Sequence, residues 1–237
     1  MDTNNLLNSK QYYDSIAEEY AFIKKQKRSY LDKVDSIIIN DFFQRSKKVL
    51  DVGAGDGLRG VKIFKQIEAK TICLVEESGE MIKNIGSLEG VEVFVGSIRN
   101  FPCQQDFDLI LCLWNVLGHI NNFQERVQIL TLMKNCLSKN GVIAIDFNNR
   151  FNYKNYGVMN VIRNIIMSFF GKETGWFELK NHNNDIISRV YIHNYFEIKK
   201  IISQSGLRVK DLKVINYDDG TIHDNIFQGQ YLFYLKK

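Results

Sequence analysis

The residues best placed to do chemistry lie in the stretch KVLDVGAGDGLRGV, at positions 48 to 61. Val49, Leu50 and Val52 form a short aliphatic run that is typical of a strand buried on both faces. The run leads into alternating glycines and then into a segment with helical spacing of apolar residues. Such a turn brings bare backbone N–H groups close to a ligand, and the helix dipole favours a carboxylate or phosphate there. We therefore predict a ligand-binding turn.

The spacing of these glycines separates two classes of ligand. A dinucleotide-binding turn requires G-x-G-x-x-G, but position 58 is Leu, so the last glycine is missing. The chain has G-x-G-x-G, with an acid two residues before the first glycine. In this it resembles the first motif of class I S-adenosylmethionine-dependent methyltransferases. The resemblance implies that the methionine end of the cofactor, S-adenosylmethionine, is held by Asp51, Gly53, Ala54, Gly55 and Gly57.

A second acid follows the next predicted strand, which spans residues 71 to 75. Glu76 ends that strand, and in a parallel sheet of order 3-2-1 it lies beside the glycine turn. There it can accept hydrogen bonds from both hydroxyls of an adenosine ribose. The resemblance favours Glu76 for this role because Ser78 and Met81 match the family's continuation, and it adds Glu77 and Met81 as cofactor contacts. The alternative interpretation is a surface carboxylate at a strand end.

The third and fourth predicted strands supply the next candidates. Residues 91 to 95 precede Ser97 and Ile98, where the family usually carries an Asp that bonds the adenine amino group. A Ser hydroxyl accepts such a bond without charge. Residues 106 to 113 begin with the Phe-Asp-aliphatic form typical of the family. Leu113 and Trp114 at its end are candidate cofactor contacts, with packing in the core as the alternative for Trp114.

Two residues after strand four are catalytic candidates, because the carboxyl ends of the strands form the ligand crevice. Methyl transfer requires alignment of donor and acceptor and an unprotonated nucleophile. His119 titrates near neutrality and could accept a proton; alternatively it caps the next helix or bonds a backbone carbonyl. Asn115 could orient an amine or hydroxyl, or it satisfies loop backbone groups instead.

The segment after the fifth predicted strand, residues 142 to 145, is polar. Asp146 is its single acid, so we predict no metal. Arg150 could hold a carboxylate or phosphate of the substrate, or pair with a surface acid. His193 and His223 could reach the mouth of the site. The candidate substrate contacts are Asn148, Asn149, Arg150, Tyr153 and His193.

The elements that must position these residues follow from periodicity. Residues 9 to 44 read as helix, and the family resemblance makes Tyr13 and Tyr20 candidates for a lid over the cofactor; alternatively they pack on the sheet. The basic run that begins at Lys24 is a solvated face or contacts phosphate. Further predicted elements are a helix at 122–137 ended by Asn140-Gly141, a helix at 155–171, strands at 176–179 and 186–192 around a turn at 181–185, a helix from Asn194 to Gly206, and strands at 207–214 and 230–235.

Together these elements predict an α/β fold, and the resemblance implies a doubly wound, seven-stranded, mostly parallel sheet of order 3-2-1-4-5-7-6. With 237 residues and 45% hydrophobic content, we expect one domain. Its parts are a helical lid (8–44), a cofactor-binding core (48–150), an insertion (151–192) and a C-terminal part (193–237). The insertion is expected to cover the substrate or to form a dimer face.

Composition points to a cytoplasmic protein that is a monomer or homodimer. No run approaches the ~18 apolar residues of a membrane span, and the polar N-terminus shows no signal peptide. The four cysteines form no CxxC pair, so buried, reduced thiols are expected. A net charge of +4 permits an anionic substrate without arguing for nucleic acid or a membrane as partner.

The resemblance implies methyl transfer from S-adenosylmethionine, which leaves S-adenosylhomocysteine, to N or O of a small polar metabolite such as a sugar, amino-sugar or biosynthetic intermediate. Strand four is followed by no [DN]-P-P-[FY] motif, which lowers the weight of nucleobase and release-factor substrates. The alternatives are an RNA-modifying methyltransferase and a non-catalytic cofactor-binding partner protein. An NAD-linked oxidoreductase is a more distant third.

Overall fold

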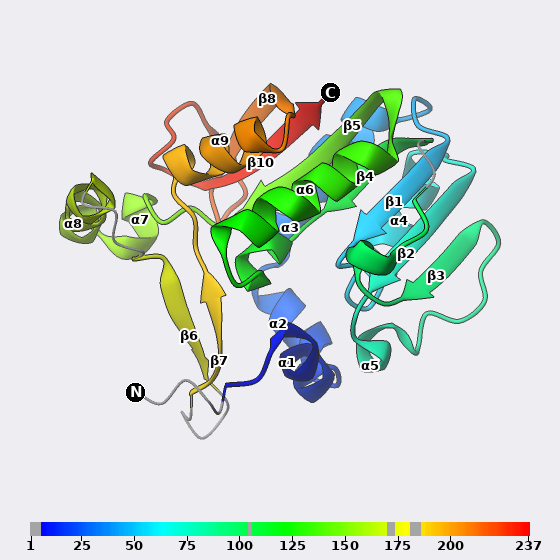
Figure 1. Ribbon diagram of the computed structural model, residues 1–237, viewed down its shortest axis with the longest axis horizontal. Helices are drawn as coiled ribbons and strands as arrows, with labels where there is room; N and C mark the ends of the chain where they lie inside the picture. Colours follow the sequence, from blue (N-terminus) through cyan, green and yellow to red (C-terminus); the bar gives the residue numbers. More distant parts are fainter. Residues whose placement is uncertain (1–5, 104–105, 170–173, 181–185) are drawn as a thin grey trace.

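The computed structural model describes residues 6–103, 106–169, 174–180 and 186–237. Within these residues the central feature is an eight-stranded sheet of order β3-β2-β1-β4-β5-β10-β8-β9 (Figure 1). Its strands are β1 (Lys48–Val52), β2 (Thr71–Glu76), β3 (Val91–Val95), β4 (Phe107–Cys112), β5 (Leu137–Phe147), β8 (Arg208–Ile215), β9 (Ile222–His223) and β10 (Gln230–Lys236). The helices around it are α1 (Ser9–Ile16), α2 (Tyr20–Gln26), α3 (Arg28–Phe42), α4 (Leu58–Gln66), α5 (Gly79–Ile82), α6 (Phe123–Cys136) and α9 (Tyr195–Gln204).

The predicted fold class and strand order are confirmed. Strands β3, β2, β1, β4 and β5 pair in parallel, and β10 runs antiparallel between β5 and β8. The order 3-2-1-4-5-7-6 therefore holds, with β8 as the sixth strand and β10 as the seventh. The strand count differs by one, because the short β9 pairs with the outer edge of β8.

Each face of the sheet carries its own hydrophobic core. Helices α6 and α9 cover one face, and α3 and α4 cover the other (Figure 1). Consecutive residues of β1 point to opposite faces: Leu50 belongs to the core under α6 and α9, and Val49 to the core under α3 and α4. A strand buried on both sides needs an unbroken apolar run, which is why this signal was visible in the sequence.

The long N-terminal helix predicted over residues 9 to 44 is wrong, because the segment forms three helices. A turn at residues 17–19 separates α1 from α2, and Lys27 separates α2 from α3. In one continuous helix Tyr13 and Tyr20 would lie about 10 Å apart along the axis. The turn brings their ring centroids to 6.3 Å. Helices α1 and α2 cross the end of the sheet at which the parallel strands terminate (Figure 1).

The predicted boundary between the sixth helix and the fifth strand is also wrong. Helix α6 ends at Cys136, and β5 begins at once, so Asn140-Gly141 lies inside the strand. The pairing with β4 shifts there, from Phe107 opposite Leu137 to Leu109 opposite Val142. An Asn-Gly pair marks a turn in isolation, but the neighbouring strand accommodates it as an irregularity in the ladder.

The cysteines depart from the expectation of four reduced thiols. Cys103 and Cys136 form a disulfide, whereas Cys73 and Cys112 are free and buried. The bond links the loop after the 3₁₀ turn η2 (Ile98–Asn100) to the C-terminus of α6. A separation of 33 residues with no CxxC spacing carries no sequence signal for this pairing.

The insertion stands beside the N-terminal segment. It contains α7 (Tyr153–Tyr156), α8 (Val158–Phe169) and an antiparallel pair, β6 (Trp176–Lys180) and β7 (Ile186–Tyr191). The backbone N–H of Leu7 donates to the carbonyl of Ile187 over 2.8 Å, which joins β7 to the segment before α1. The apolar face of α8 is exposed at Met159, Ile162 and Ile166. The predicted helix stop at Gly171 and the turn at 181–185 lie outside the described residues.

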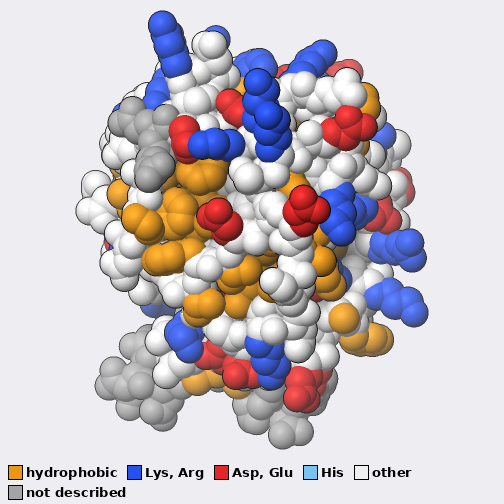
Figure 2. All heavy atoms as spheres, turned by 90° about the vertical axis from the view of Figure 1, so that its right-hand side faces the viewer, with side chains coloured by type: hydrophobic (Ala, Val, Ile, Leu, Met, Phe, Trp, Pro, Cys, Tyr) orange, Lys and Arg blue, Asp and Glu red, His pale blue; other side chains and the backbone are white. Residues whose placement is uncertain are grey.

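Strand β3 forms an open edge of the sheet. Its residues Val93 and Val95 are exposed, and Figure 2, which faces this side, shows apolar side chains interspersed with acidic and basic ones. None of the described helices is both long and apolar enough to cross a lipid bilayer.

Candidate active site

A cavity of about 390 Å³ lies at the carboxyl ends of the parallel strands, beneath α1 and α2. Its volume falls in the range of small-molecule sites. The residues that line it follow β1, β2, β3 and β4 or belong to α1, α2 and α6. The predicted site residues among them are Tyr13, Tyr20, Gly53, Gly55, Glu76, Glu77, Ser97, Ile98, Leu113, Trp114 and His119.

The glycine turn is shaped for close approach. Gly53 and Gly55 have φ of +72° and +59°, a conformation that favours glycine. A Cβ on Gly53 would lie 2.8 Å from the side chain of Val116, and one on Gly55 would lie 3.0 Å from the hydroxyl of Tyr20. Side chains in the turn would therefore fill the space between β1 and the lid.

The backbone N–H groups of this turn are not bare, contrary to our expectation. Gly53 and Ala54 both donate to the carbonyl of Val75, Gly55 donates to the Glu76 carboxylate and Gly57 to the carbonyl of Ala54. The turn therefore lets a ligand come close to its backbone, but these N–H groups are not free to bind it. Its amides instead bind it to the end of β2.

Glu76 is the centre of the polar side of the cavity. It is 8% exposed, and its two oxygens accept hydrogen bonds from the N–H groups of Gly55, at 2.8 Å, and Ser78, at 2.9 Å. Burial raises the pKa of Glu76, and these two donors oppose the shift. A carboxylate has about four acceptor sites, so two bonds leave capacity for a ligand's hydroxyls. The two amides also hold the carboxylate in one orientation.

Aromatic rings from the lid close the other side. The ring of Tyr20 lies 5.4 Å from that of Trp114, and the ring of Tyr13 lies 5.1 Å from that of His119. The Tyr13 hydroxyl is 2.9 Å from Nε2 of His119. This contact joins residues 106 positions apart and ties α1 to the 3₁₀ turn η3 (Val116–His119).

Both members of this contact are neutral. Burial lowers the pKa of His119 to about 4, so its ring is neutral at physiological pH. Burial also raises the pKa of Tyr13, which stays protonated. With Nδ1 carrying the ring proton, Nε2 accepts from the Tyr13 hydroxyl; in the other tautomer it donates. The pair is thus a neutral proton acceptor facing the cavity.

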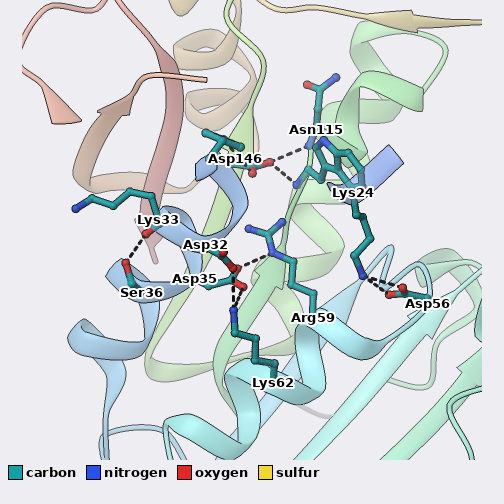
Figure 3. A network of polar contacts seen from close by, with 12 residues as sticks. Lys24, Asp32, Lys33, Asp35, Ser36, Asp56, Arg59, Lys62, Asn115 and Asp146 are labelled. Atoms are coloured by element: carbon teal, nitrogen blue, oxygen red, sulfur yellow. Dashed lines mark hydrogen bonds and ion pairs between the residues drawn. The ribbon is translucent and has the colours of Figure 1, made fainter. Parts of the chain in front are cut away.

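An ion pair joins the lid to the glycine turn (Figure 3). Lys24 of α2 contacts the carboxylate of Asp56 at 2.7 Å. In the same basic run Arg28 pairs with Asp32, and Lys27 lies over the ring of Tyr217. These contacts favour the interpretation of the run as a structural, partly solvated face.

Four predicted cofactor contacts do not line the cavity. Asp51 lies beneath the turn against Gly60, where an added Cβ would collide with its carboxylate, and burial raises its pKa to about 7. Gly57 packs toward Leu74, and Met81 is buried in α5. Ala54 packs against the core on the α3 side. The geometry gives these residues a supporting position, without direct access to a ligand.

Asn115 is likewise buried and does not line the cavity. Its side-chain oxygen accepts from the N–H of Asn148 at 3.2 Å, and its amide donates to the carbonyl of Tyr191 at 3.3 Å. The alternative interpretation, that Asn115 satisfies loop backbone, agrees with these contacts. Of the two catalytic candidates, only His119 faces the cavity.

The predicted substrate contacts lie away from the cavity. Arg150 is fully buried and pairs with Glu197 at 2.7 Å. The Asn149 amide donates to backbone carbonyls of residues 226 and 229. The Tyr153 hydroxyl accepts a hydrogen bond from the Gln228 amide. Both ring nitrogens of the buried His193 lack a hydrogen-bond partner among the described residues. Packing of the C-terminal strands against the insertion turned these side chains inward, which no local pattern revealed.

Several residues that line the cavity were not predicted. Arg99 and Glu125 form an ion pair of 2.9 Å at its edge. Glu125 lies within the helix predicted from residue 122, and a helix that starts just after a strand's carboxyl end lies near the crevice. The other missed lining residues include Asn8, Ser9, Lys10, Gly96, Val116, Ile120, Asn121 and Ile129. Across the described residues, no three His, Cys, Asp or Glu side chains are grouped so as to hold a metal ion.

Comparison with known proteins identifies a matching family and similar folds. A family model described as a methyltransferase domain matches residues 43–181. No curated protein matches the sequence significantly. Among solved structures, a methyltransferase from Methanosarcina mazei aligns at 14% identity and TM-score 0.64, covering 84% of this chain and 96% of its own. One from Clostridium acetobutylicum aligns at 16% and 0.60, covering 92% and 98%.

A third solved structure carries ligands. It is the 1,6-didemethyltoxoflavin-N1-methyltransferase of Burkholderia thailandensis, with its substrate and S-adenosylhomocysteine bound. It aligns at 13% identity and TM-score 0.65, and the alignment covers 96% of this chain and 86% of that one. At these identities the likeness shows a shared fold over nearly the whole chain.

Proposed function

Because the chain belongs to the methyltransferase domain family, we propose that it transfers a methyl group from S-adenosylmethionine to N or O of a small polar molecule. The observation that carries the proposal is Glu76, held beside the glycine turn with acceptor capacity facing a cavity of about 390 Å³. A paired diol is the chemistry that suits a fixed carboxylate of this kind. The ribose of the donor supplies it.

The remaining walls fit the other parts of the donor. Ile98 and Leu113 offer apolar surface for a planar base, and Ser97 also lines the cavity. Tyr13, Tyr20 and Trp114 add aromatic faces, against which a positive charge is stabilised. When bound, the donor supplies a methyl carbon already activated by its sulfonium.

The chain's own part in the reaction is to align the acceptor and manage its proton. The lid tyrosines exclude water from the aromatic end of the cavity. His119 is neutral there, and in the tautomer whose Nε2–H donates to the Tyr13 hydroxyl, Nδ1 has the free lone pair that can accept a proton from the acceptor while Tyr13 holds the ring in place. A base whose pKa is about 4 removes protons poorly from an alcohol, so an amine, ring nitrogen or acidic hydroxyl suits this site better.

A small acceptor is also supported by the enclosure of the site. Helices α1 and α2 cover the cavity, and contacts from Tyr13, Asp14 and Lys24 bind them to the body of the protein. The small-molecule enzyme from Burkholderia thailandensis has the same fold over most of this chain. No described residue of the 151–192 segment lines the cavity, so its role as a direct cover has no support from the geometry.

The test combines calorimetry with a labelled donor. We expect the purified chain to bind S-adenosylhomocysteine and to transfer labelled methyl into the small-molecule fraction of a cell extract. Label in the RNA fraction, with affinity that falls steeply with salt, would favour the RNA-modifying alternative. Binding without transfer to any fraction would favour a non-catalytic cofactor-binding protein. Absence of binding would refute the proposal.

A further inference from the structure

The turn that follows β4 is strained in an unusual way. Trp114 and Asn115 are consecutive non-glycine residues with φ of +73° and +58°. An L-residue disfavours this left-handed region, and Trp has no short polar side chain that would ease the conformation. Two such residues in a row persist only where the surroundings hold them.

One buried carboxylate provides that hold. Asp146, next to the end of β5, is 1% exposed, and its Oδ1 accepts from the N–H of Trp114 at 2.5 Å and from the N–H of Asn115 at 2.8 Å (Figure 3). Its Oδ2 accepts from the hydroxyl of Tyr30 at 3.1 Å. All three donors point at one acid, so each of its oxygens has a partner.

The charge of this acid is balanced from α4. Arg59 donates through Nε to Asp35 at 2.6 Å, and its two terminal nitrogens are buried without a hydrogen-bond partner among the described residues. Burial raises the pKa of Asp146, whereas the positive charge of Arg59 and the N–H donors lower it. An anion that accepts three hydrogen bonds beside a buried guanidinium is a consistent arrangement.

The turn determines two walls of the cavity. It sets the direction of the Trp114 ring, which contacts Tyr20, and it starts η3, which carries Val116 and His119. Val116 in turn closes over Gly53. A change in the turn would therefore displace the aromatic residues of the site and alter the packing of Val116 on the glycine turn.

From these contacts we infer that Asp146 is the positioning residue of the active site: its carboxylate holds the left-handed Trp114–Asn115 turn and so places Trp114 and His119 against the reacting groups. It acts through the backbone of the turn and does not itself line the cavity. The inference uses the proposed function only for the ligand that reports on the site.

The test uses Trp114 as its own reporter. The chain has two tryptophans, so Trp176→Phe leaves Trp114 as the single fluorophore. In that background we expect Asp146→Ala to raise acrylamide quenching of Trp114 at least about twofold and to weaken S-adenosylhomocysteine binding at least about tenfold. Asp146→Asn keeps an oxygen that accepts from both N–H groups, so we expect both readouts within about threefold of the parent.

The outcomes are separable. If Asp146→Ala does not fold, Asp146→Ser replaces it, because a hydroxyl satisfies one N–H; the same quenching increase is expected. Unchanged quenching in the folded Ala or Ser variant refutes the inference, as does an Asn variant as impaired as the Ala variant. If the parent protein fails to bind S-adenosylhomocysteine, the proposed function is refuted, and quenching still decides the role of Asp146.

Discussion

Glu76 and His119 show how burial gives two titratable side chains opposite tasks in one cavity. Burial disfavours the charged form of both groups, so it raises the pKa of Glu76 and lowers the pKa of His119. Two backbone N–H groups donate to Glu76 and stabilise its carboxylate as an acceptor. His119 contacts only the Tyr13 hydroxyl and stays neutral. The carboxylate therefore suits recognition and the imidazole suits proton acceptance.

Replacement of Glu76 by Ala is expected to weaken S-adenosylhomocysteine binding at least tenfold, because two hydrogen bonds to one charged acceptor are each worth roughly 1.5–3 kcal/mol. Isothermal calorimetry measures this directly. Glu92→Ala, which removes an exposed carboxylate from the neighbouring β3, is the matched control and should bind as the parent does. An affinity unchanged within about twofold in Glu76→Ala would remove the assignment.

The pKa of His119 predicts a pH dependence of stability. Its folded pKa, about 4, lies below the ordinary value of 6.5, so the unfolded chain binds more protons between these values. The stability contribution is therefore complete above pH 6.5 and lost as the pH falls toward 4. Relative to His119→Asn, the parent should lose about 1–2 kcal/mol of unfolding free energy between pH 7 and pH 5. Equal losses in both proteins, measured by urea denaturation, would contradict the shift.

At the scale of elements, the lid is fastened at separate points along α1 and α2. Tyr13 contacts His119, Asp14 accepts from the Ser78 hydroxyl at 2.5 Å, and Lys24 pairs with Asp56. The partners lie in η3, beside α5 and in the glycine turn. Together with the aromatic contacts of Tyr13 and Tyr20 with His119 and Trp114, these polar contacts hold α1 and α2 over the cavity.

Breaking the Lys24–Asp56 pair with Asp56→Asn is expected to loosen α2 selectively. Both side chains are mostly buried, yet part of the pair remains in solvent, so we expect a loss of about 0.5–1 kcal/mol confined to the lid. Hydrogen exchange of α2 amides should accelerate about fivefold, with global stability nearly unchanged. Arg28→Met removes an exposed pair with Asp32 and serves as the control. Equal exchange in parent and Asp56→Asn would show that the pair does not fasten the lid.

At the scale of the whole molecule, long-range links join the cavity walls to the body of the fold. The disulfide between Cys103 and Cys136 connects the loop after η2 to α6, and η2 and α6 both carry cavity residues. On the opposite side, the hydrogen bond from Leu7 to β7 joins the N-terminal segment to the insertion. All the described residues that line the cavity lie between Asn8 and Ile129, so these links join it to the body of the fold without adding to its walls.

The disulfide predicts a measurable share of global stability. Alkylation of the unreduced, unfolded chain should label only Cys73 and Cys112. For a 33-residue separation, Cys103→Ser should lower the unfolding free energy by about 2–4 kcal/mol. The reduced parent should match the variant in urea titrations. Labelling of four cysteines without reductant would show that the bond does not form.

The sequence by itself revealed the glycine turn, the acid Glu76 after the second strand and the helix that begins after Asn194, because each depends on residues close together in the chain, whereas the order of the sheet followed from the family resemblance. Asn194 and Glu197, for example, form the capping box that starts α9. The parallel topology then brings the strand ends together without further information.

Only the tertiary structure decided which polar residues face the cavity. Asn149, Arg150 and His193 looked available, but the C-terminal strands and the insertion bury them. Conversely, the roles of Asp146 and Tyr13 depend on partners 31 or more positions away. Such contacts arise from the packing of separate elements, and the physical cost of burying a polar group is fixed only once its partners are in place.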